Sequence, residues 1–381
     1  MRICLLTDSP ELTGPRQPED DWQCDPRPFL PDADWDWQVL EKPSAVRRLV
    51  QLARDGYDLF FNLCDGAWDE DRPGIEVVQT LERLGLPFTG ADSRFYEPSR
   101  EAMKRVCHAR GIGTPDYVMV HRPEDIERAA RTMEFPLIVK HPSSYASIGL
   151  TPASRVETAD ALRAQAAATL TQFGGALVER FIEGREFTVL VAENPDDAQQ
   201  PLTYTPVEFR FPEGESFKHE RLKWVDYHDV GDVPVEDAAL SARLRDMAAS
   251  FFVGLEGVGY GRCDIRMDGN GELYMLEINP NCGIYYPATD AGSADLCLLH
   301  DDAGHAGFTR NIVRAALQRH DGRTQSWEVR TNGNGEYGVF AIRAIRKGDP
   351  IIRFEERAHV LVTRSHVDTH WHEPDRSWFL R

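Results

Sequence analysis

Short apolar runs alternate with amphipathic segments over the first 90 residues, and this order restricts the fold more than any other feature of the sequence. Residues 2–7 (RICLLT) and 57–66 (YDLFFNLCDG) have the composition of buried strands. Residues 44–56 (SAVRRLVQLARDG) and 74–90 (GIEVVQTLERLGLPFTG) each predict a helix, and the second helix leads into another strand. Strands that alternate with helices imply a parallel sheet, so we expect an α/β domain here.

Two details of this region are expected from local pattern. Ser44 is placed to cap the first helix, and the apolar positions at helical spacing in that helix are expected to face the core: Val46, Leu49, Val50 and Leu52. The stretch 9–36 is rich in Pro and Asp and has no periodicity, so it is predicted to be loop.

A second set of elements follows Gly90, and its order suggests further domains. Helices are predicted in residues 98–111, 160–173, 238–257 and 308–320, and strands in residues 117–120, 134–140 and 175–193, the last broken at Glu183-Gly184. A polar stretch, residues 321–335, is predicted to be a linker. At 381 residues the chain exceeds the usual size of one hydrophobic core.

Charge and cysteine usage narrow the class of protein. A formal net charge of -19 with no basic run disfavours binding to nucleic acid. The seven cysteines are scattered and never paired as CxxC, which argues against a disulfide framework and a zinc knuckle. The first apolar run is too short for a signal peptide, and no 18-residue apolar span occurs. We expect a cytoplasmic protein without a membrane partner.

Residues 263–281 (CDIRMDGNGELYMLEINPN) gather two acids and an amide around a Gly-rich turn. If DGNG forms a four-residue hairpin loop, Asp264 lies opposite Met275, and alternation of side chains puts Asp264, Glu277 and Asn279 on one face. Two carboxylates on one face repel each other, so a cation is expected between them. Oxygen ligands of these types beside a phosphate are typical of Mg²⁺.

The same alternation is typical of a solvent-facing hairpin. In that interpretation the acids lie outside while Leu276 and Ile278 lie inside. The spacing alone does not decide between a metal site and a solvated surface.

Six motifs in order resemble the ATP-grasp ligases, and most of all their D-alanine:D-alanine ligase branch. They are YDLFFNLCDG, LERLGLPFTG, ARGIGTPDY, FPLIVK, LVERFIEGREFTV and GRCDIRMDGNGELYMLEINPN. The resemblance spans residues 1–320 and implies an α/β (α+β) ATP-grasp fold with an N-terminal parallel-sheet domain and a small β-rich C-terminal appendage. The implied division is 1–92 (N-terminal α/β), 93–180 (central ATP-grasp subdomain), 181–320 (C-terminal ATP-grasp subdomain with the metal site) and 321–381 (linker and appendage).

The resemblance also implies ligands for the triphosphate. Asp264, Glu277 and Asn279 match the residues that hold two Mg²⁺ ions against the ATP phosphates, and Mn²⁺ is expected to substitute. Lys140, at the end of FPLIVK, matches a phosphate-binding lysine, a role that suits a compact ammonium group. Without the motif, a lysine at a strand end is most often only solvated. Lys218 resembles a lysine on a mobile loop that reaches the phosphates.

The nucleoside is expected to lie against LVERFIEGRE. By resemblance, Glu179 accepts a hydrogen bond from the adenine amino group, and Ile182 offers backbone atoms to the base. Glu186 binds the ribose hydroxyls, which suits a carboxylate because it only accepts. Phe181 is placed to pack near the base, although an aromatic residue at such a position is more often simply part of a core.

Two residues are expected to act on the reacting groups. Arg262 matches the arginine that stabilises charge on the reacting phosphate and oxyanion, and the Gly283 amide is placed to donate to the oxyanion. The resemblance therefore implies an ATP-dependent carbon–nitrogen ligase that makes an acylphosphate from a carboxylate and passes the acyl group to an amine. The implied substrates are amino acids or small peptides, and the implied oligomer is a homodimer.

The sequence departs from the family pattern around both substrates. Arg100 stands where the family has an ATP-contacting lysine, with Lys104 one turn later. The loop after Lys140 is Gly-poor (HPSSYASIGL), so Ser147 is expected to supply a phosphate donor there. Asp65 replaces a histidine, and CGIYYPATD replaces a Pro-Gly-Met-Thr pattern that contacts the second amino acid. The identity of the substrates therefore does not carry over.

The last part of the chain carries a weaker resemblance. Residues 333–354 (GNGEYGVFAIRAIRKGDPIIRF) resemble the opening strands of a SET domain, but the later SET segments are missing before Arg381, which indicates a partial module. His366, His370 and His372 have a spacing that could hold a metal, although a polar terminus is the commoner explanation.

Three functions stay open at this point. The first is a carboxylate–amine ligase, which we favour because all three predicted metal ligands are present. The second is a phosphotransferase that uses the same ATP-binding fold for a small-molecule kinase reaction. The third is a non-catalytic nucleotide-binding or interaction protein, which is suggested by the altered loop after Lys140 and by the partial tail.

Overall fold

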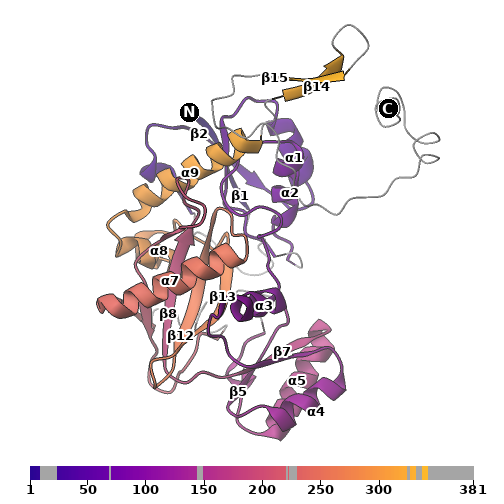
Figure 1. Cartoon of the computed structure of the whole chain (residues 1–381), viewed down its shortest axis with the longest axis vertical. Coiled ribbons are helices and arrows are strands. Elements are labelled where there is room, and N and C mark those ends of the chain that lie inside the picture. The colour runs from indigo at the N-terminus through magenta and orange to yellow at the C-terminus, as the bar shows by residue number, and fades with distance from the viewer. Residues whose placement is uncertain are drawn as a thin grey trace, which may run out of the picture. The chain divides into compact units, whose positions relative to one another are not determined.

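A computed structural model of the chain describes residues 1–8, 24–67, 70–143, 149–219, 222, 230–323, 327–331 and 337–341. The chain divides into two compact units, Met1–Arg323 and Thr324–Arg381 (Figure 1). In the second unit the described residues form one antiparallel hairpin of β14 (Trp327–Thr331) and β15 (Tyr337–Ala341). Ser147, the histidine-rich tail and most of the SET-like segment lie outside the described residues. The assignment of that segment stays a prediction.

The N-terminal part of the first unit contains the predicted parallel sheet. Its elements are β1 (Arg2–Asp8), the 3₁₀ helix η2 (Arg27–Phe29), β2 (Asp34–Leu40), α1 (Ala45–Leu52), β3 (Leu59–Asn62) and α2 (Ile75–Arg83). The strand order is β2-β1-β3 and both pairings are parallel, so this prediction is confirmed. The carboxyl ends of β1 and β3 therefore meet at one edge, where ligands of open α/β sheets commonly bind.

Three local predictions in this part were wrong. The stretch expected to be loop up to Asp36 contains the start of β2, because DWDWQVL alternates apolar and polar residues as an edge strand does. Val46 and Val50 are 42% and 38% exposed, so α1 buries a narrower face than its apolar residues suggested. Ser44 makes no side-chain cap, since its hydroxyl donates to the Glu41 carbonyl instead.

A second, antiparallel sheet follows, with two helices on one face. Its elements are α3 (Arg100–Arg110), β4 (Tyr117–Val120), α4 (Pro123–Thr132), β5 (Leu137–Lys140), η3 (Pro152–Ser154), β6 (Arg155–Val156), α5 (Ala159–Phe173) and β7 (Ala176–Arg180). The strand order is β4-β7-β5-β6. A separate core that includes Ile126, Leu162 and Val178 joins α4 and α5 to this sheet. The sequence analysis did not predict α4.

The third sheet is larger and carries the hairpin that the sequence singled out. Its strands are β8 (Arg185–Ala192), β9 (Leu202–Thr203), β10 (Val207–Arg210), β11 (Gly231–Pro234), β12 (Tyr260–Met267) and β13 (Leu273–Pro280). The order is β11-β10-β8-β12-β13, with β9 paired to β8. The accompanying helices are α7 (Ala238–Gly254), η5 (Ala288–Asp290), α8 (Ser293–Leu299) and α9 (Gly304–Arg323).

Both faces of the large sheet are covered, and α7 crosses β8, β12 and β13 in Figure 1. One face joins α7 and the N-terminal helices in a core that includes Val189 and Cys263, and the other joins α8 and α9 through residues such as Leu190 and Phe308. All seven cysteines have free thiols. Within the described ranges, no helix combines the length and the apolar character that a membrane crossing requires.

The register of the β12–β13 hairpin differs from the prediction. Asp264 lies opposite Glu277 rather than Met275, because a β-bulge follows Asp264 and adds Leu276 to β13. The hairpin loop is also one residue longer than expected, since Met267 pairs with Leu273. The bulge reverses the alternation on β13, so Met275 is fully buried in the core while Leu276 and Glu277 both line a pocket.

A close backbone contact joins the N-terminal part of this unit to the large sheet. Gly259 has φ +73°, and a Cβ built on it would lie 2.2 Å from the Gly90 carbonyl carbon. We expect Gly259→Ala to lower the free energy of unfolding by about 1–3 kcal/mol, because backbone atoms cannot move aside as a side chain can. Urea titration measures this change. Gly85→Ala is the control, since Gly85 also has a positive φ but meets nothing within 4 Å, and an equal loss in the two variants would contradict the steric explanation.

Candidate active site

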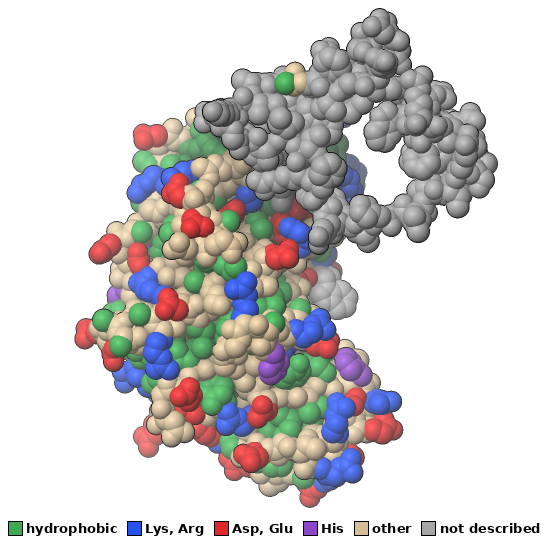
Figure 2. Space-filling model, in the orientation of Figure 1, with side chains coloured by type: hydrophobic (Ala, Val, Ile, Leu, Met, Phe, Trp, Pro, Cys, Tyr) green, Lys and Arg blue, Asp and Glu red, His purple; other side chains and the backbone are tan. Residues whose placement is uncertain are grey.

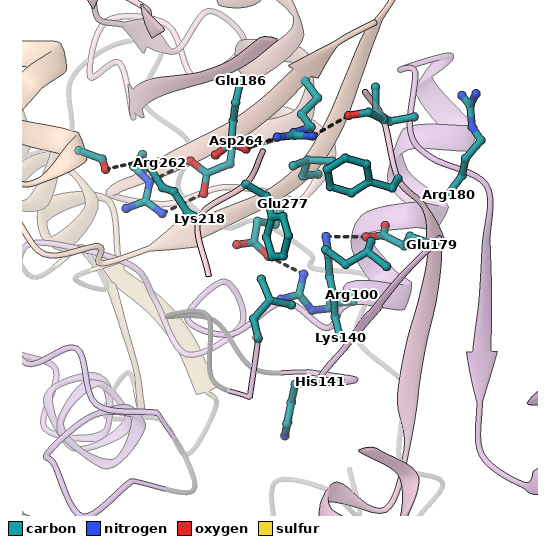
Figure 3. Close-up of a pocket in the computed structure, with 18 residues that line it drawn as sticks. Arg100, Lys140, His141, Glu179, Arg180, Glu186, Lys218, Arg262, Asp264 and Glu277 are labelled. Carbon is teal, nitrogen blue, oxygen red and sulfur yellow. Dashed lines mark hydrogen bonds and ion pairs between the residues drawn. The ribbon is translucent and has the colours of Figure 1, made fainter. Parts of the chain in front are cut away.

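A pocket of about 100 Å³ lies between the small antiparallel sheet and the large sheet. Its lining includes Arg100 from α3, Lys140 from β5, Glu179 and Arg180 from β7, Glu186 from β8, and Arg262, Asp264, Arg266, Leu276 and Glu277 from the β12–β13 hairpin. In Figure 3 the labelled side chains of Arg100, Lys140, Arg262, Asp264 and Glu277 lie around one space, whereas Arg180 points away from it. Residues separated by more than 170 positions in the sequence are therefore brought together.

The β12–β13 face carries the first cluster of this pocket. Arg262 and Asp264 alternate on β12, and the Arg262 guanidinium donates two hydrogen bonds to the Asp264 carboxylate, at 3.1 Å from Nε and 2.9 Å from Nη2. Burial alone would lower the pKa of Arg262, but the Asp264 carboxylate outweighs it and the pKa is raised. Asn279 Nδ2 donates to Asp264 Oδ2 at 3.2 Å. Asp264, Glu277 and Asn279 thus share a face, as predicted.

The second predicted metal carboxylate is also paired with an arginine. Glu277 accepts a hydrogen bond from Arg100 Nη1, which reaches it from the first residue of α3. Ser99 caps this helix by accepting from the Ala102 amide at 3.1 Å, so the position of Arg100 is fixed by its helix end. The repulsion between the Asp264 and Glu277 carboxylates is offset, because each one is paired with a guanidinium group.

A buried trio of charges lies on the other side of the pocket. Glu179 is 1% exposed, and its carboxylate forms ion pairs with Lys104 and with Lys140, the latter at 2.7 Å. Lys104 also donates to the Thr114 hydroxyl at 2.8 Å. Burial by itself would raise the pKa of Glu179, but the two ammonium groups outweigh it and lower the pKa to about 2. Both oxygens of the carboxylate that was predicted to accept from the adenine amino group thus form ion pairs with lysines.

The depressed pKa of Glu179 has a direct consequence for stability. The carboxyl has a pKa of about 2 in the folded chain against 4.5 ordinarily, so its stabilisation is complete above pH 4.5 and is lost as the pH falls from 4.5 towards 2. We expect the free energy of unfolding, measured by urea titration, to fall by about 3 kcal/mol across this window from this group alone. In a Glu179→Gln variant the free energy of unfolding should fall by about 3 kcal/mol less over the same pH range. If the free energy of unfolding fell equally with pH in the variant and the original protein, the assignment to Glu179 would be contradicted.

The far end of the pocket is apolar. Ile138, Phe181 and Phe217 form a small separate core with Leu150 packed against it, and all four line the pocket. The Phe181 and Phe217 rings meet edge to face with centroids 5.8 Å apart. An apolar lining of this kind suits a planar base better than it suits a charged group.

A second cavity of about 480 Å³ adjoins the first, and Lys218, Arg262 and Ser293 line both. Lys218 Nζ donates to Ser293 Oγ at 3.3 Å and lies over the Phe209 ring. Asn279 and Gly283 line this cavity. A group bound at Arg262 would therefore be reachable from both sides, which is the arrangement a transfer between two substrates requires.

The walls of the second cavity are charged. Arg72 bridges Asp8 and Asp65 at 2.5 Å from each, at the carboxyl edge of the parallel sheet, and burial raises the pKa of Asp65 to about 6. A Cβ on Gly283 would lie 2.4 Å from the Tyr286 hydroxyl oxygen, so glycine alone fits beside that ring. Asp65 and the CGIYYPATD segment, to which Tyr286 belongs, are positions at which the sequence departs from the family pattern, whereas Gly283 is retained.

The donor set on the hairpin face fits Mg²⁺. It consists of two carboxylates and an amide oxygen, which are hard ligands, and Lys140 and Lys218 line the same pocket for the phosphates that usually complete such a site. Among the described residues, no group of three or more His, Cys, Asp or Glu side chains is placed to hold a metal ion. That result is compatible with this set, because one of its three members is an asparagine.

Ten of the predicted site residues line the first pocket, and Asn279 and Gly283 line the second. Lys218 and Arg262 line both cavities, and Ser147 lies outside the described residues. Their individual roles stay predictions. The sequence analysis missed Arg266, whose signal was present because it follows Arg262 and Asp264 at the two-residue spacing of one strand face. It named Lys104 only as a neighbour of Arg100 and did not predict the contact of Lys104 with Glu179.

The chain is similar in sequence to D-alanine–D-alanine ligases. The family model for the D-ala D-ala ligase C-terminus matches residues 106–287. A D-alanine–D-alanine ligase of Chromohalobacter salexigens is 31% identical over 231 residues, which cover 60% of this chain and 67% of that protein. The corresponding enzyme of a Janthinobacterium species is 29% identical over 270 residues, 67% of this chain and 81% of that protein.

A solved structure shows that the resemblance extends to the fold. The D-alanine–D-alanine ligase of Bacillus anthracis complexed with ATP superposes with a TM-score of 0.61 at 18% identity, over 84% of this chain and 98% of that chain. The predicted ATP-grasp architecture is confirmed by this match. From the sequence relatives and the shared fold together, the chain belongs to the D-alanine–D-alanine ligase family of ATP-grasp proteins.

Proposed function

We propose that the chain is an ATP-dependent ligase that joins the carboxylate of an amino acid or small peptide to an amine and releases ADP and phosphate. Membership of the D-alanine–D-alanine ligase family supports the reaction class. The observation that carries the proposal is the junction of the two cavities at Lys218, Arg262 and Ser293. One cavity has the lining of a nucleotide site, and the other is large enough for small polar substrates.

The chemistry assigned to the junction has two steps. A carboxylate oxygen attacks the γ-phosphorus of ATP, the bond to the β-phosphate oxygen breaks, and ADP leaves an acylphosphate. The amine nitrogen then attacks the acyl carbon, phosphate leaves with the bonding electrons, and the proton lost by the amine passes to solvent. Lys140, Lys218 and Arg262 offset the charge of the transferred phosphate, and the Gly283 amide and Arg262 donate to the tetrahedral oxyanion.

In the proposed enzyme, Asp264, Glu277 and Asn279 would hold Mg²⁺. When bound, Mg²⁺ neutralises phosphate charge and orients the triphosphate. The residues of the chain itself exclude water from the apolar end, orient the nucleoside and keep cationic groups at the junction. The homodimer implied by the family resemblance stays a prediction.

The proposal is tested by incubating the protein with Mg-ATP and a library of amino acids, singly and in pairs, while ADP and new amide masses are measured. A ligase releases ADP in proportion to amide. A phosphotransferase would release ADP with a phosphorylated acceptor and no need for an amine, and a binding protein would bind ATP without turnover. Either of the last two outcomes contradicts the ligase.

Arg262 gives a residue-level test of the junction. We expect Arg262→Lys to lower kcat about 100-fold, because lysine keeps the positive charge but loses the planar fork that holds Asp264 and reaches the reacting group. Steady-state ADP release measures the change. Arg243→Lys is the matched control, since Arg243 donates to the Gly271 carbonyl at the exposed hairpin end. If the kcat of Arg262→Lys stayed within a few-fold of the original value, Arg262 would have no role in the reaction.

A further inference from the structure

Arg266 is a buried charge that the proposed chemistry does not use. It lies on β12, is 3% exposed, and lines the first pocket. Its guanidinium donates from Nε to Glu186 Oε2 at 3.1 Å and from Nη1 to the Ile182 carbonyl at 2.6 Å. Its Nη2 donates to the Ser216 carbonyl and lies 3.0 Å from Glu186 Oε2. One side chain thus contacts acceptors on Ile182, Glu186 and Ser216.

Each of these three residues lies on a segment that borders the nucleotide pocket. Ile182 belongs to the connection between β7 and β8, Glu186 lies at the start of β8, and Ser216 precedes Lys218 by two residues. The guanidinium carbon also lies 4.7 Å from the centre of the Phe181 ring, which belongs to the apolar end of the pocket. Arg266 therefore contacts Phe181 at the apolar end of the pocket and the Glu186 carboxylate, which is predicted to bind the ribose. It also contacts Ser216, in the segment that leads to Lys218.

Packing alone does not account for an arginine at this place. Removing a guanidinium and a carboxylate from water costs several kcal/mol, and an apolar side chain of similar volume would fill the same space. An apolar side chain could not hold the Glu186 carboxylate in one rotamer, and it could not donate hydrogen bonds to the Ile182 and Ser216 carbonyls. The arrangement has the form of a support for residues that meet a ligand.

We propose that Arg266 is a positioning residue for the nucleoside: it holds the Glu186 carboxylate toward the ribose hydroxyls and fixes the Phe181–Ile182 connection beside the base. This inference rests on the proposed ATP-dependent function, because it assumes that a nucleoside triphosphate enters the first pocket. It does not depend on which carboxylate or amine is joined, nor on whether amide is formed.

The test compares three ligands by titration calorimetry with Mg²⁺ present: ATP, 2′,3′-dideoxyATP and tripolyphosphate. In the original protein we expect ATP to bind at least about tenfold tighter than dideoxyATP, because a charged acceptor loses two hydroxyl donors. Arg266→Lys keeps the charge but cannot span three acceptors. We expect the preference for ATP over dideoxyATP to fall to about twofold, while the Kd of tripolyphosphate stays within about twofold of the original value.

A matched control separates positioning from general damage to the sheet. Arg185→Lys breaks a similar two-point pair with Glu208 on the neighbouring strand, at 2.8 and 2.7 Å, and neither residue lines the two cavities. The ribose preference should be unchanged in this variant. If Arg266→Lys weakens ATP, dideoxyATP and tripolyphosphate equally, or leaves the ribose preference intact, the inference is overturned.

A second variant keeps the inference testable if Arg266→Lys folds poorly. Glu186→Gln removes the carboxylate charge while leaving an oxygen for Arg266, and we expect it to lose the ribose preference to the same extent. A Glu186→Gln protein that retains the preference overturns the inference, because Arg266 acts through that carboxylate. If the original protein does not bind ATP, the proposed function and this inference fail together; if it binds ATP but makes no amide, only the proposed function fails.

Discussion

Asp264→Asn should lower the rate of ATP turnover about 1,000-fold, which corresponds to about 4 kcal/mol of barrier. The substitution keeps the shape of the side chain but removes one of the two carboxylates on the hairpin face. An amide oxygen is a weaker ligand for Mg²⁺ than a carboxylate, so the triphosphate would lose charge neutralisation where the reaction needs it. Steady-state ADP release across a range of Mg²⁺ concentrations measures the effect, and part of the loss should be recovered at high Mg²⁺.

Glu272→Gln is the control for this variant. Glu272 lies on the same hairpin, is exposed and does not line either cavity, so the same isosteric loss of charge there should leave turnover unchanged. Because Asp264 also pairs with Arg262, folding of both variants is checked by thermal unfolding. A folded Asp264→Asn protein with turnover close to the original would show that the hairpin face does not hold the metal.

Glu179→Gln should lower the free energy of unfolding by about 3–5 kcal/mol, the usual cost of breaking a buried ion pair from one side. The glutamine would leave the ammonium groups of Lys104 and Lys140 facing each other without a carboxylate. Lys104 is 1% exposed, and burial lowers its pKa even with Glu179 ionised, so water cannot replace the lost partner. Urea titration near pH 7 measures the loss.

Two comparisons make this prediction specific. Glu127→Gln breaks a surface pair with Arg163, whose side chains are 50% and 44% exposed, and should leave stability almost unchanged. Adding Lys104→Met to Glu179→Gln should restore part of the stability, because one uncompensated charge is removed. A Glu179→Gln protein as stable as Glu127→Gln would mean that the buried trio does not stabilise the fold.

The hairpin shows how much of the site a sequence can predict. Alternation along β12 and β13 was enough to put Asp264, Glu277 and Asn279 on one face, and the structure confirms that placement. The register behind it was wrong, because a β-bulge changes the pairing without leaving a mark in the local sequence. The face was still correct, since the bulge lies between Met275 and Glu277 and leaves the spacing of the two ligands on β13 intact.

Contacts between distant segments were beyond local reasoning. The family motif identified Lys140 and Glu179 separately, but nothing in the sequence showed that Lys104 would enter the same buried cluster from α3. The burial of Arg266 was equally hidden, because a strand face can be solvated or covered depending on which element packs over it. Such long-range pairs are fixed by tertiary packing, which local periodicity does not record.

The same limit applies at the protein surface. Val46 and Val50 fit the helical spacing of α1 yet remain partly exposed, because the width of a buried face depends on the neighbour that covers it. On the face drawn in Figure 2, acidic and basic side chains are interspersed over the described residues. This distribution agrees with the absence of a basic run in the sequence.

The central claim is that one face of the β12–β13 hairpin holds magnesium against a triphosphate. A crystal structure of the protein with Mg²⁺ and a non-hydrolysable ATP analogue tests it most directly. We expect metal bound by oxygens of Asp264, Glu277 and Asn279, phosphates beside Lys140, and the base among Ile138, Phe181 and Phe217. Density for the analogue elsewhere, with Asp264 still closed on Arg262 and Glu277 on Arg100, would contradict the account.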